Sequence, residues 1–290
     1  MKKTLIAACA IIAILPVYFI NIAAQSGDIR WQDAAKELDA LPFSRAFIDS
    51  VTAAHLGSHT QGGLRHSPPG KFAEGEMLVY QAGWGPFMAG YFILEARNFR
   101  SRGLIRLSAK AMTSNVISAF YKMREHSLSW VDAAGFYPHF FEQHVREGSK
   151  YKLDAYLVYD NKNKKLFHKR REEVTEVESP KFTHDYLSLL YYARTMPLQP
   201  GDTFDAQLYT RPKTDPVKFK VLNKRETVKT DAGTFKCVIV EPTFLGDSRA
   251  FNRKSKIEVW VTDDENKYPV MIKSKAKFGS VQAKLIHISK

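Results

Sequence analysis

The residue types best suited to chemistry in this sequence are carboxylates that lie near histidines. Glu142 lies between His139 and His144, and a carboxylate beside an imidazole can form an acid–base pair. Strand alternation would place those two histidines on opposite faces. Asp263 and Asp264 could ligate a cation or act as acid and base, but adjacent carboxylates in a strand-linking turn point apart. We therefore predict no catalytic residue, cofactor or metal site.

Three histidines in the N-terminal part raise a separate metal hypothesis. His55 and His59 would share one face of a helix, but Leu56-Gly57-Ser58 weakens that helix and no carboxylate lies close in sequence. We interpret this stretch, with His66, as a polar loop, and the role of the three histidines stays open.

Aromatic and charged side chains offer binding chemistry instead. Aromatic rings can stack on a sugar or an acyl chain. A predicted helix over Thr183–Thr195 carries Asp185 at its start and Arg194 at its end, too far apart to pair with each other. Each therefore needs a partner in the sheet or in a ligand. The candidate ligand-binding residues are Tyr80, Trp84, Asp185, Tyr191, Tyr192, Arg194 and Trp260.

A basic stretch is a second candidate surface. We predict that residues 160–171 form a hairpin tip that contacts anionic lipid, lipopolysaccharide or acidic glycan, in keeping with the net charge of +13. A charged strand edge that resists aggregation is the alternative. No nucleic-acid motif is present, so nucleic acid is not an expected partner. The residues concerned are Lys164, Lys165, Lys169, Arg170 and Arg171.

Short runs of alternating polarity, separated by turn residues, dominate the chain after Phe72. They predict a mainly β fold: a single antiparallel meander curled into a barrel or half-barrel, with one helix packed across it and a short helical N-terminal segment. The helix is Thr183–Thr195, with Thr183 as its N-cap and Leu187, Leu190 and Tyr191 facing the sheet. A shorter helix is predicted over 113–124, and one strand over Leu166–Val177.

The first residues have the pattern of an export signal. Lys2 and Lys3 precede an apolar run from Leu5 to Ile20, and Ala23-Ala24 provides a small-residue exit. We predict a signal peptide over 1–24, cleaved after Ala24, with an uncleaved N-terminal anchor as the alternative. Both place the body outside the cytoplasm, in the periplasm of a Gram-negative bacterium. Cleavage would leave Cys237 as the one cysteine, which we expect to be buried in a strand.

An ordered set of short motifs resembles the bacterial family catalogued as domain of unknown function 3108. The motifs are Gly75-Glu-Met-Leu-Val-Tyr80, Gly90, Asp185-Tyr-Leu-Ser-Leu-Leu-Tyr-Tyr-Ala-Arg194, Pro197-Leu198 with Gly201, Gly233-Thr-Phe235, Trp260-Val-Thr-Asp263, Pro269-Val270 and Gly279. The resemblance implies an exported or envelope-associated β-rich protein with no settled activity. The expected organisation is a signal or anchor over 1–24, a helical segment and loop over 25–70, and a β-rich domain over 71–290.

These expectations favour non-catalytic binding of a lipid, glycan or envelope partner. A curled sheet closed by a helix encloses an apolar concavity, which is the usual form of a ligand pocket. An enzyme acting on cell-wall or capsule glycan is one alternative and would require paired carboxylates in one cleft. An envelope assembly or scaffolding component is the other. The ligand and the oligomeric state are not predicted.

Overall fold

The computed structural model describes residues 64–67, 75–84, 87–99, 103–149, 151–171, 173–246, 256–276 and 279–289. The predicted signal or anchor, the N-terminal helical segment and His55 and His59 lie outside these residues. His66 lies within them and is exposed.

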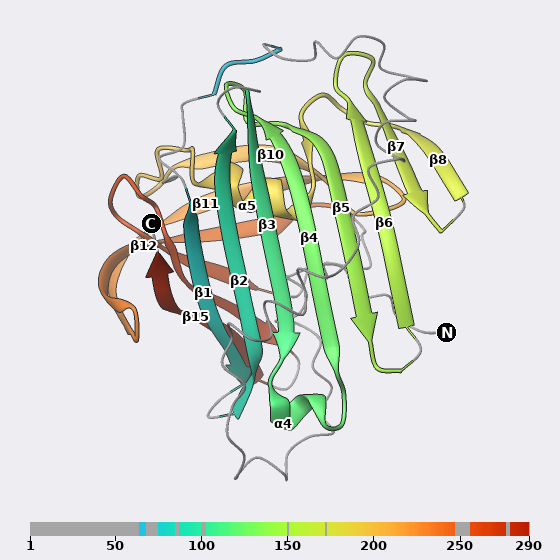
Figure 1. Ribbon diagram of the computed structural model, residues 1–290. Coiled ribbons are helices and arrows are strands. Elements are labelled where there is room, and N and C mark those ends of the chain that lie inside the picture. The colour runs from blue at the N-terminus through green and yellow to red at the C-terminus, as the bar shows by residue number, and fades with distance from the viewer. Residues whose placement is uncertain are drawn as a thin grey trace.

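The described residues form one large, mainly antiparallel sheet, as the alternating pattern predicts. Its first run of strands, each beside the next, forms the front layer in Figure 1. These strands are β1 (Glu76–Trp84), β2 (Phe87–Phe99), β3 (Leu104–Thr113), β4 (Met123–Asp132), β5 (Pro138–Glu147), β6 (Tyr151–Asp160), β7 (Lys165–Arg170) and β8 (Glu173–Glu178).

A second run forms the other half of the sheet and lies behind the first layer (Figure 1). It comprises β9 (Thr183–His184), β10 (Thr203–Tyr209), β11 (Thr214–Thr230), β12 (Gly233–Phe244), β13 (Ile257–Thr262), β14 (Pro269–Ala276) and β15 (Gly279–Ser289). The two runs join where β1 pairs with β15, with Met77 opposite Ser289 and Trp84 opposite Val281.

The sheet curls but does not close. Its strand order begins at β8 and ends at β9, which pairs in parallel with β10. Side chains rather than a strand ladder link the two ends: Ser179 Oγ donates to Thr183 Oγ1 at 2.9 Å and lies 3.3 Å from Thr214 Oγ1. We call this region, where β7 and β8 approach β9 and β10, the seam.

Two helices occur in the described residues, α4 (Asn115–Ser118) and α5 (Tyr186–Ala193). The first is shorter than the helix predicted over 113–124, because β3 continues through Thr113 and β4 begins at Met123. Neither described helix has the length and apolarity needed to cross a membrane.

The predicted start of the long helix at Thr183 is wrong. Thr183 and His184 pair with Gln207 and Leu208 of β10, so the backbone stays extended through both residues. Asp185 is the N-cap instead, and Arg194 is the C-cap. The N-cap therefore lies two residues later than predicted, and the helix is shorter by about a turn.

The predicted strand over Leu166–Val177 is also divided. Arg171 adopts a left-handed backbone conformation, with φ of 57°, and the chain reverses there between β7 and β8. Lys164 and Lys165 consequently lie at one end of β7, whereas Arg170 and Arg171 lie at the other. The basic stretch is not a single hairpin tip.

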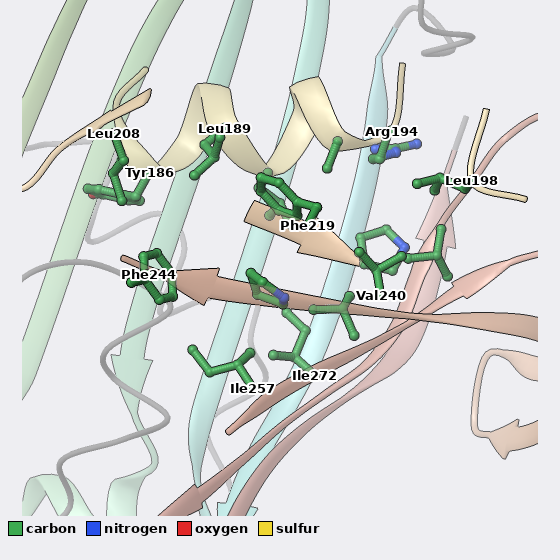
Figure 2. Close-up of a pocket in the computed structure, with 16 residues that line it drawn as sticks. Tyr186, Leu189, Arg194, Leu198, Leu208, Phe219, Val240, Phe244, Ile257 and Ile272 are labelled. Atoms are coloured by element: carbon green, nitrogen blue, oxygen red, sulfur yellow. The ribbon is translucent and has the colours of Figure 1, made fainter. Parts of the chain in front are cut away.

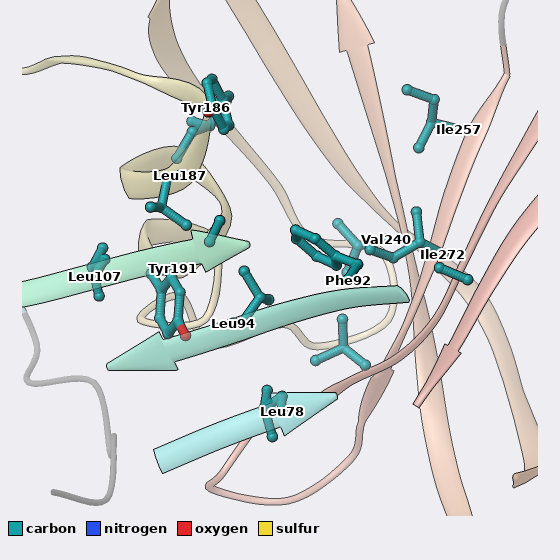
Figure 3. Packing of buried hydrophobic residues seen from close by; sticks show 14 of the residues in the cluster. Leu78, Phe92, Leu94, Leu107, Tyr186, Leu187, Tyr191, Val240, Ile257 and Ile272 are labelled. Atoms are coloured by element: carbon teal, nitrogen blue, oxygen red, sulfur yellow. The ribbon is translucent and has the colours of Figure 1, made fainter. Parts of the chain in front are cut away.

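The main core fills the space between the two layers and α5. Inward-facing side chains of β1 and β2, such as Leu78 and Leu94, meet Leu187 and Tyr191 of α5 and Val240 of β12 (Figure 3). All of these side chains are at most 3% exposed. Cys237 of β12 belongs to the same core and is fully buried, as predicted from its strand.

Candidate ligand-binding site

The start of α5 is fixed by a buried carboxylate. Asp185 Oδ1 accepts hydrogen bonds from the backbone N–H groups of Leu187 and Ser188 at 2.9 and 2.8 Å, which is the standard N-cap arrangement. Its Oδ2 accepts from Ser129 Oγ of β4 at 2.8 Å. Burial raises the pKa of Asp185 to about 6, although these hydrogen bonds act in the opposite direction. The cap thus also ties α5 to β4.

A second buried carboxylate, Glu125 of β4, fixes the first turn of α5. Glu125 Oε1 of β4 accepts from Tyr186 OH at 3.0 Å and from Gln143 Nε2 of β5 at 2.8 Å. Ser127 Oγ lies in close contact with Tyr186 OH and also donates to Glu125. Burial raises the pKa of Glu125. Side chains of β4 and β5 therefore fix the position of Tyr186.

The end of α5 is anchored to β1 by an ion pair. Arg194 Nη1 and Nη2 donate to Glu76 Oε1 and Oε2 at 2.7 and 2.9 Å, and Nη2 also donates to the Asn266 carbonyl. The Arg194 and Glu76 side chains are 2% and 0% exposed. A bidentate pair of this kind fixes geometry as well as charge. Both ends of α5 therefore have partners in the sheet.

Between these anchors, α5 covers an apolar cavity (Figure 2). Helix residues such as Leu189 and Leu190 face side chains of β10–β14, among them Phe219, Val240 and Ile272. The cavity volume is about 70 Å³, where one water molecule requires about 10–15 Å³. The full lining in the described residues is Tyr186, Leu189, Leu190, Ala193, Arg194, Leu198, Leu208, Phe219, Val240, Pro242, Phe244, Ile257, Val259, Val261, Pro269 and Ile272.

The lining of the cavity is mostly apolar. Its described lining contains no Asp, Glu, His, Ser or Cys, and Arg194 already has its guanidinium engaged by Glu76. Phe244 and Val259 are only half-buried, so the cavity is accessible from their side. The described residues also contain no cluster of three metal-ligating side chains.

The sequence comparison identifies the family. Residues 79–286 match the family described as protein of unknown function DUF3108. The chain belongs to the DUF3108 family. No curated protein matches its sequence.

Solved structures show how the DUF3108 fold relates to other proteins. A β-barrel-like protein of the domain of unknown function DUF1849 from Brucella abortus aligns with a TM-score of 0.53 at 12% identity, over 78% of this chain and 98% of that one. Two others resemble the chain more weakly. One is an exported-protein candidate with a YmcC-like fold from Bacteroides fragilis, with a TM-score of 0.29, 12% identity and coverage of 78% and 100%. The other is a lipoprotein candidate from Parabacteroides distasonis, with a TM-score of 0.32, 10% identity and coverage of 78% and 99%.

In this DUF3108 domain, the predicted ligand-binding residues do not converge on one site. Of the seven, only Arg194 lines the cavity. Tyr80 and Tyr191 are fully buried in the core, and Asp185 is the helix cap. Trp260 lies between Val259 and Val261, which line the cavity, so strand alternation directs it to the other face of β13, where its Nε1 donates to Glu226 at 2.8 Å.

The other two predicted aromatic residues lie at the margins of the domain. Trp84 is half-buried at the end of β1, opposite Phe87 and Val281. Tyr192 stacks on His184, with 4.7 Å between ring centroids, and the Arg65 guanidinium lies 4.9 Å above its ring. Tyr192 therefore links residues 64–67 to α5.

The cavity residues that the sequence argument missed are mostly aliphatic residues of β12–β14. The alternation of residue types along these strands did indicate their inward faces. Val238 and Val240 fall on one face of β12, and Val259 and Val261 on one face of β13. Such a pattern identifies an inward face but cannot show whether that face is filled by other side chains or left open. Glu76 and Glu125 were also missed, although each is a charged residue on an inward strand face.

Proposed function

We propose that this DUF3108 domain is a non-catalytic binding protein of the cell envelope that holds the hydrocarbon chain of a lipid in the cavity under α5. The observation that carries the proposal is the lining, which is apolar apart from Arg194, engaged by Glu76, and Tyr186, whose hydroxyl donates to Glu125. Ligand sites of this kind are largely preformed and apolar. The signal-like pattern of residues 1–24 supports an envelope location.

The polar contacts of α5 support a preformed site. Asp185, Tyr186 and Arg194 each bond to the sheet, so the helix keeps its distance from β12 and β13 without filling the space beneath it. An open apolar cavity loses dispersion contacts on its walls. A hydrocarbon chain would restore those contacts, whereas water would find no hydrogen-bond partners there.

The cavity gives no support to glycan hydrolysis. That reaction requires two carboxyl groups facing one cleft, and the described lining has none. Glu142 and Asp154 do flank His144 on β5 and β6, at 3.6 and 2.7 Å. His144 and Glu142 are 1% and 3% exposed, so a polymer cannot reach the imidazole or that carboxylate, and only Asp154 faces solvent.

A cavity-filling variant tests the proposal. Val259→Trp would place a large side chain in the cavity from a half-buried position and should reduce binding of a fluorescent fatty alcohol at least tenfold. Met271→Trp, on the other face of the neighbouring strand, is the matched control and should bind like the native protein.

Mass spectrometry of the native protein purified from its own envelope gives the second readout. Co-purifying lipid is expected from the native protein and from Met271→Trp, and its loss is expected from Val259→Trp. Ligand-free native protein that also fails to bind the fatty alcohol would overturn the lipid proposal and favour a scaffolding role.

A further inference from the structure

The connections between strands gather at the two ends of the curled sheet, and one end differs from the other in composition. From β1 to β8, and from β10 to β15, consecutive strands run antiparallel, so every second connection lies at the same end. The two runs share these ends, because the last residue of β1, Trp84, pairs with Phe87 of β2 and with Val281 near the start of β15.

One end, which we call the basic rim, holds the connections β1–β2, β3–β4, β5–β6, β7–β8, β10–β11, β12–β13 and β14–β15. The helix α4 belongs to this end and marks it in Figure 1. The described connecting residues of the basic rim are 114–122, 148–149, 171, 210–213, 245–246 and 256.

The described connecting residues of the basic rim carry only positive charge. They include no Asp or Glu, and their basic side chains are all exposed: Lys122, Arg171, Arg211, Lys213 and Lys256. Two of these, Lys213 and Lys256, contact carboxylates of adjoining strands at 3.5 and 3.2 Å. The connections described at the opposite end contain acidic residues as well as basic ones: Asp202, Asp231, Asp263, Asp264 and Glu265. The charge of the connections therefore favours anionic partners at the basic rim.

Large apolar side chains are exposed at the same end. Phe87 at the start of β2, Phe120 between α4 and β4, and Leu245 after β12 are 42%, 56% and 44% exposed. Val174, at the second position of β8, is 51% exposed. Single exposed apolar residues are common on protein surfaces. In the described part of the chain, however, all four of the large apolar side chains that are exposed lie at or beside the basic rim, which indicates an interaction surface.

Backbone hydrogen bonds hold the β3–β4 connection of the basic rim in place. Ser114 N donates to the Ala89 carbonyl of β2 at 2.9 Å, and Gly148 N donates to the Lys122 carbonyl at 2.7 Å. Phe120 and Lys122 therefore lie in a connection that is bonded to β2 on one side and to the β5–β6 turn on the other. Residues that are already fixed lose less conformational entropy when they bind a partner.

We infer that the basic rim docks on the surface of an anionic phospholipid membrane. Basic side chains beside such a surface are attracted to its negative potential, and aromatic rings favour the boundary between head groups and acyl chains. Phe87 and Phe120 enter that boundary, while Lys122 and Arg211 lie among the lipid phosphates. The net charge of +13 acts in the same direction.

This inference goes beyond binding in the cavity and does not rest on it. It also moves the membrane contact away from most of the predicted basic stretch. Lys164 and Lys165 lie at the opposite end of β7 from Arg171, which belongs to the basic rim. Leu245 directly follows Phe244 of the cavity lining, so a membrane docked on the basic rim would lie beside the half-buried side of the cavity.

Co-sedimentation with vesicles measures the docking. The native protein should bind vesicles that contain phosphatidylglycerol at least tenfold more tightly than vesicles of phosphatidylcholine alone, and added salt should weaken that binding. Lys122→Gln/Arg211→Gln should bind the anionic vesicles at least tenfold more weakly, because each basic residue near such a surface contributes about fivefold. Lys162→Gln/Lys181→Gln removes the same charge from exposed positions at the opposite end and should bind like the native protein.

A fluorescent label reports which end of the sheet contacts the membrane, whether or not the N-terminal segment also inserts. Cys9→Ser leaves Cys237, which is fully buried, as the one native cysteine. In that background, an environment-sensitive label on Phe120→Cys should shift its emission to shorter wavelength when anionic vesicles are added. The same label on Asp231→Cys, an exposed position at the opposite end, should show no shift.

Phe120→Ala separates a membrane from a water-soluble polyanion. It should weaken binding to anionic vesicles at least threefold without lowering the melting temperature, because the side chain is exposed. If Phe120→Ala binds like the native protein and soluble alginate displaces the vesicles completely, the basic rim binds acidic glycan and the membrane inference is wrong.

Three further results would overturn the inference. The first is that the native protein does not bind anionic vesicles. The second is an equal loss of binding in both double variants, because binding would then follow net charge rather than position. The third is a shift of the label at position 231 and not at position 120, which also decides the matter if Lys122→Gln/Arg211→Gln melts early. Binding of the fatty alcohol in the cavity is measured separately and is not affected by these results.

Discussion

Asp185 combines two tasks that usually fall to different residues. It caps α5 through two backbone N–H groups and connects the helix to β4 through Ser129, while being only 1% exposed. An ionised carboxylate in such a place loses its hydration. These three hydrogen bonds and a fourth, from Ser188 Oγ at 2.9 Å, compensate for that loss only in part. Its neutral form is therefore relatively favoured in the folded protein.

Asp185→Asn should change how stability depends on pH. The pKa of Asp185 is raised from 3.8 to about 6 in the folded protein. Asp185 therefore stabilises the fold more below pH 4 than at pH 7. That contribution is lost as the pH rises through 6, and it amounts to about 3 kcal/mol at about 1.4 kcal/mol per pKa unit. Asparagine can cap a helix without this titration.

Denaturant unfolding of both proteins between pH 4 and pH 7.5 measures the effect. Relative to the native protein, Asp185→Asn should become more stable by up to about 3 kcal/mol as the pH rises across this range. Asp231→Asn, in an exposed turn, is the control and should show no such trend. If the free energies of unfolding of Asp185→Asn and the native protein differed by the same amount at every pH, the raised pKa of Asp185 would be refuted.

At the scale of elements, α5 is attached by polar groups at its ends and by apolar residues along its length. Leu187 and Tyr191 are 1% and 0% exposed, and Leu189 is 6% exposed. Leu190, which the sequence analysis placed on the packed face with Leu187 and Tyr191, is half-buried and lines the cavity. Truncation of Leu187 and truncation of Leu190 should therefore differ in their effect on stability.

Leu187→Ala should lower the free energy of unfolding by about 2–5 kcal/mol, the usual range for a fully buried leucine. Leu190→Ala should cost less than half as much, because its side chain already faces open space. Thermal melting of the two variants gives the comparison. Equal losses would mean that the cavity is packed in solution and contains no room for a ligand.

The sequence predicted the elements better than the site for a physical reason. Strand alternation and turn chemistry are local, so the curled antiparallel sheet and the buried strand of Cys237 followed from them. The start of α5 was misplaced because Thr183 and His184 are held extended by β10, a partner that lies more than 20 residues away in sequence. The pairing of Arg194 with Glu76 joins residues 118 apart in sequence. The cavity likewise forms between α5 and the later strands β10–β14. No local pattern encodes either arrangement.

At the scale of the whole molecule, β8 is an edge strand of the sheet that the described residues form. Most of its side chains are exposed, including Glu173, Glu176 and Glu178, and Val174 is 51% exposed. An edge strand offers unpaired N–H and C=O groups to other chains, and charged side chains are one way to prevent that pairing. The glutamates of β8 have this protective position.

Replacing Glu176 and Glu178 with threonine should make the protein self-associate. The variant keeps strand propensity while removing the charges that oppose edge-to-edge pairing. Light scattering after size-exclusion chromatography should show dimers or larger species at concentrations where the native protein has a single state. Replacing Asp202 and Asp205, near and on β10, removes the same charge from a paired part of the sheet and should leave the native state unchanged.

The pairing of β1 with β15 has a consequence for the order of folding. Among the described strands, the first obtains its second neighbour from the last, more than 200 residues later in the chain. Loop closure over such a separation is entropically costly, and folds dominated by distant contacts form slowly. During synthesis or translocation, the β1–β8 half can assemble as consecutive hairpins, yet its β1 edge stays unpaired until the final strand emerges. Losing even the last ten residues would therefore turn an interior strand into an exposed edge in the middle of the sheet.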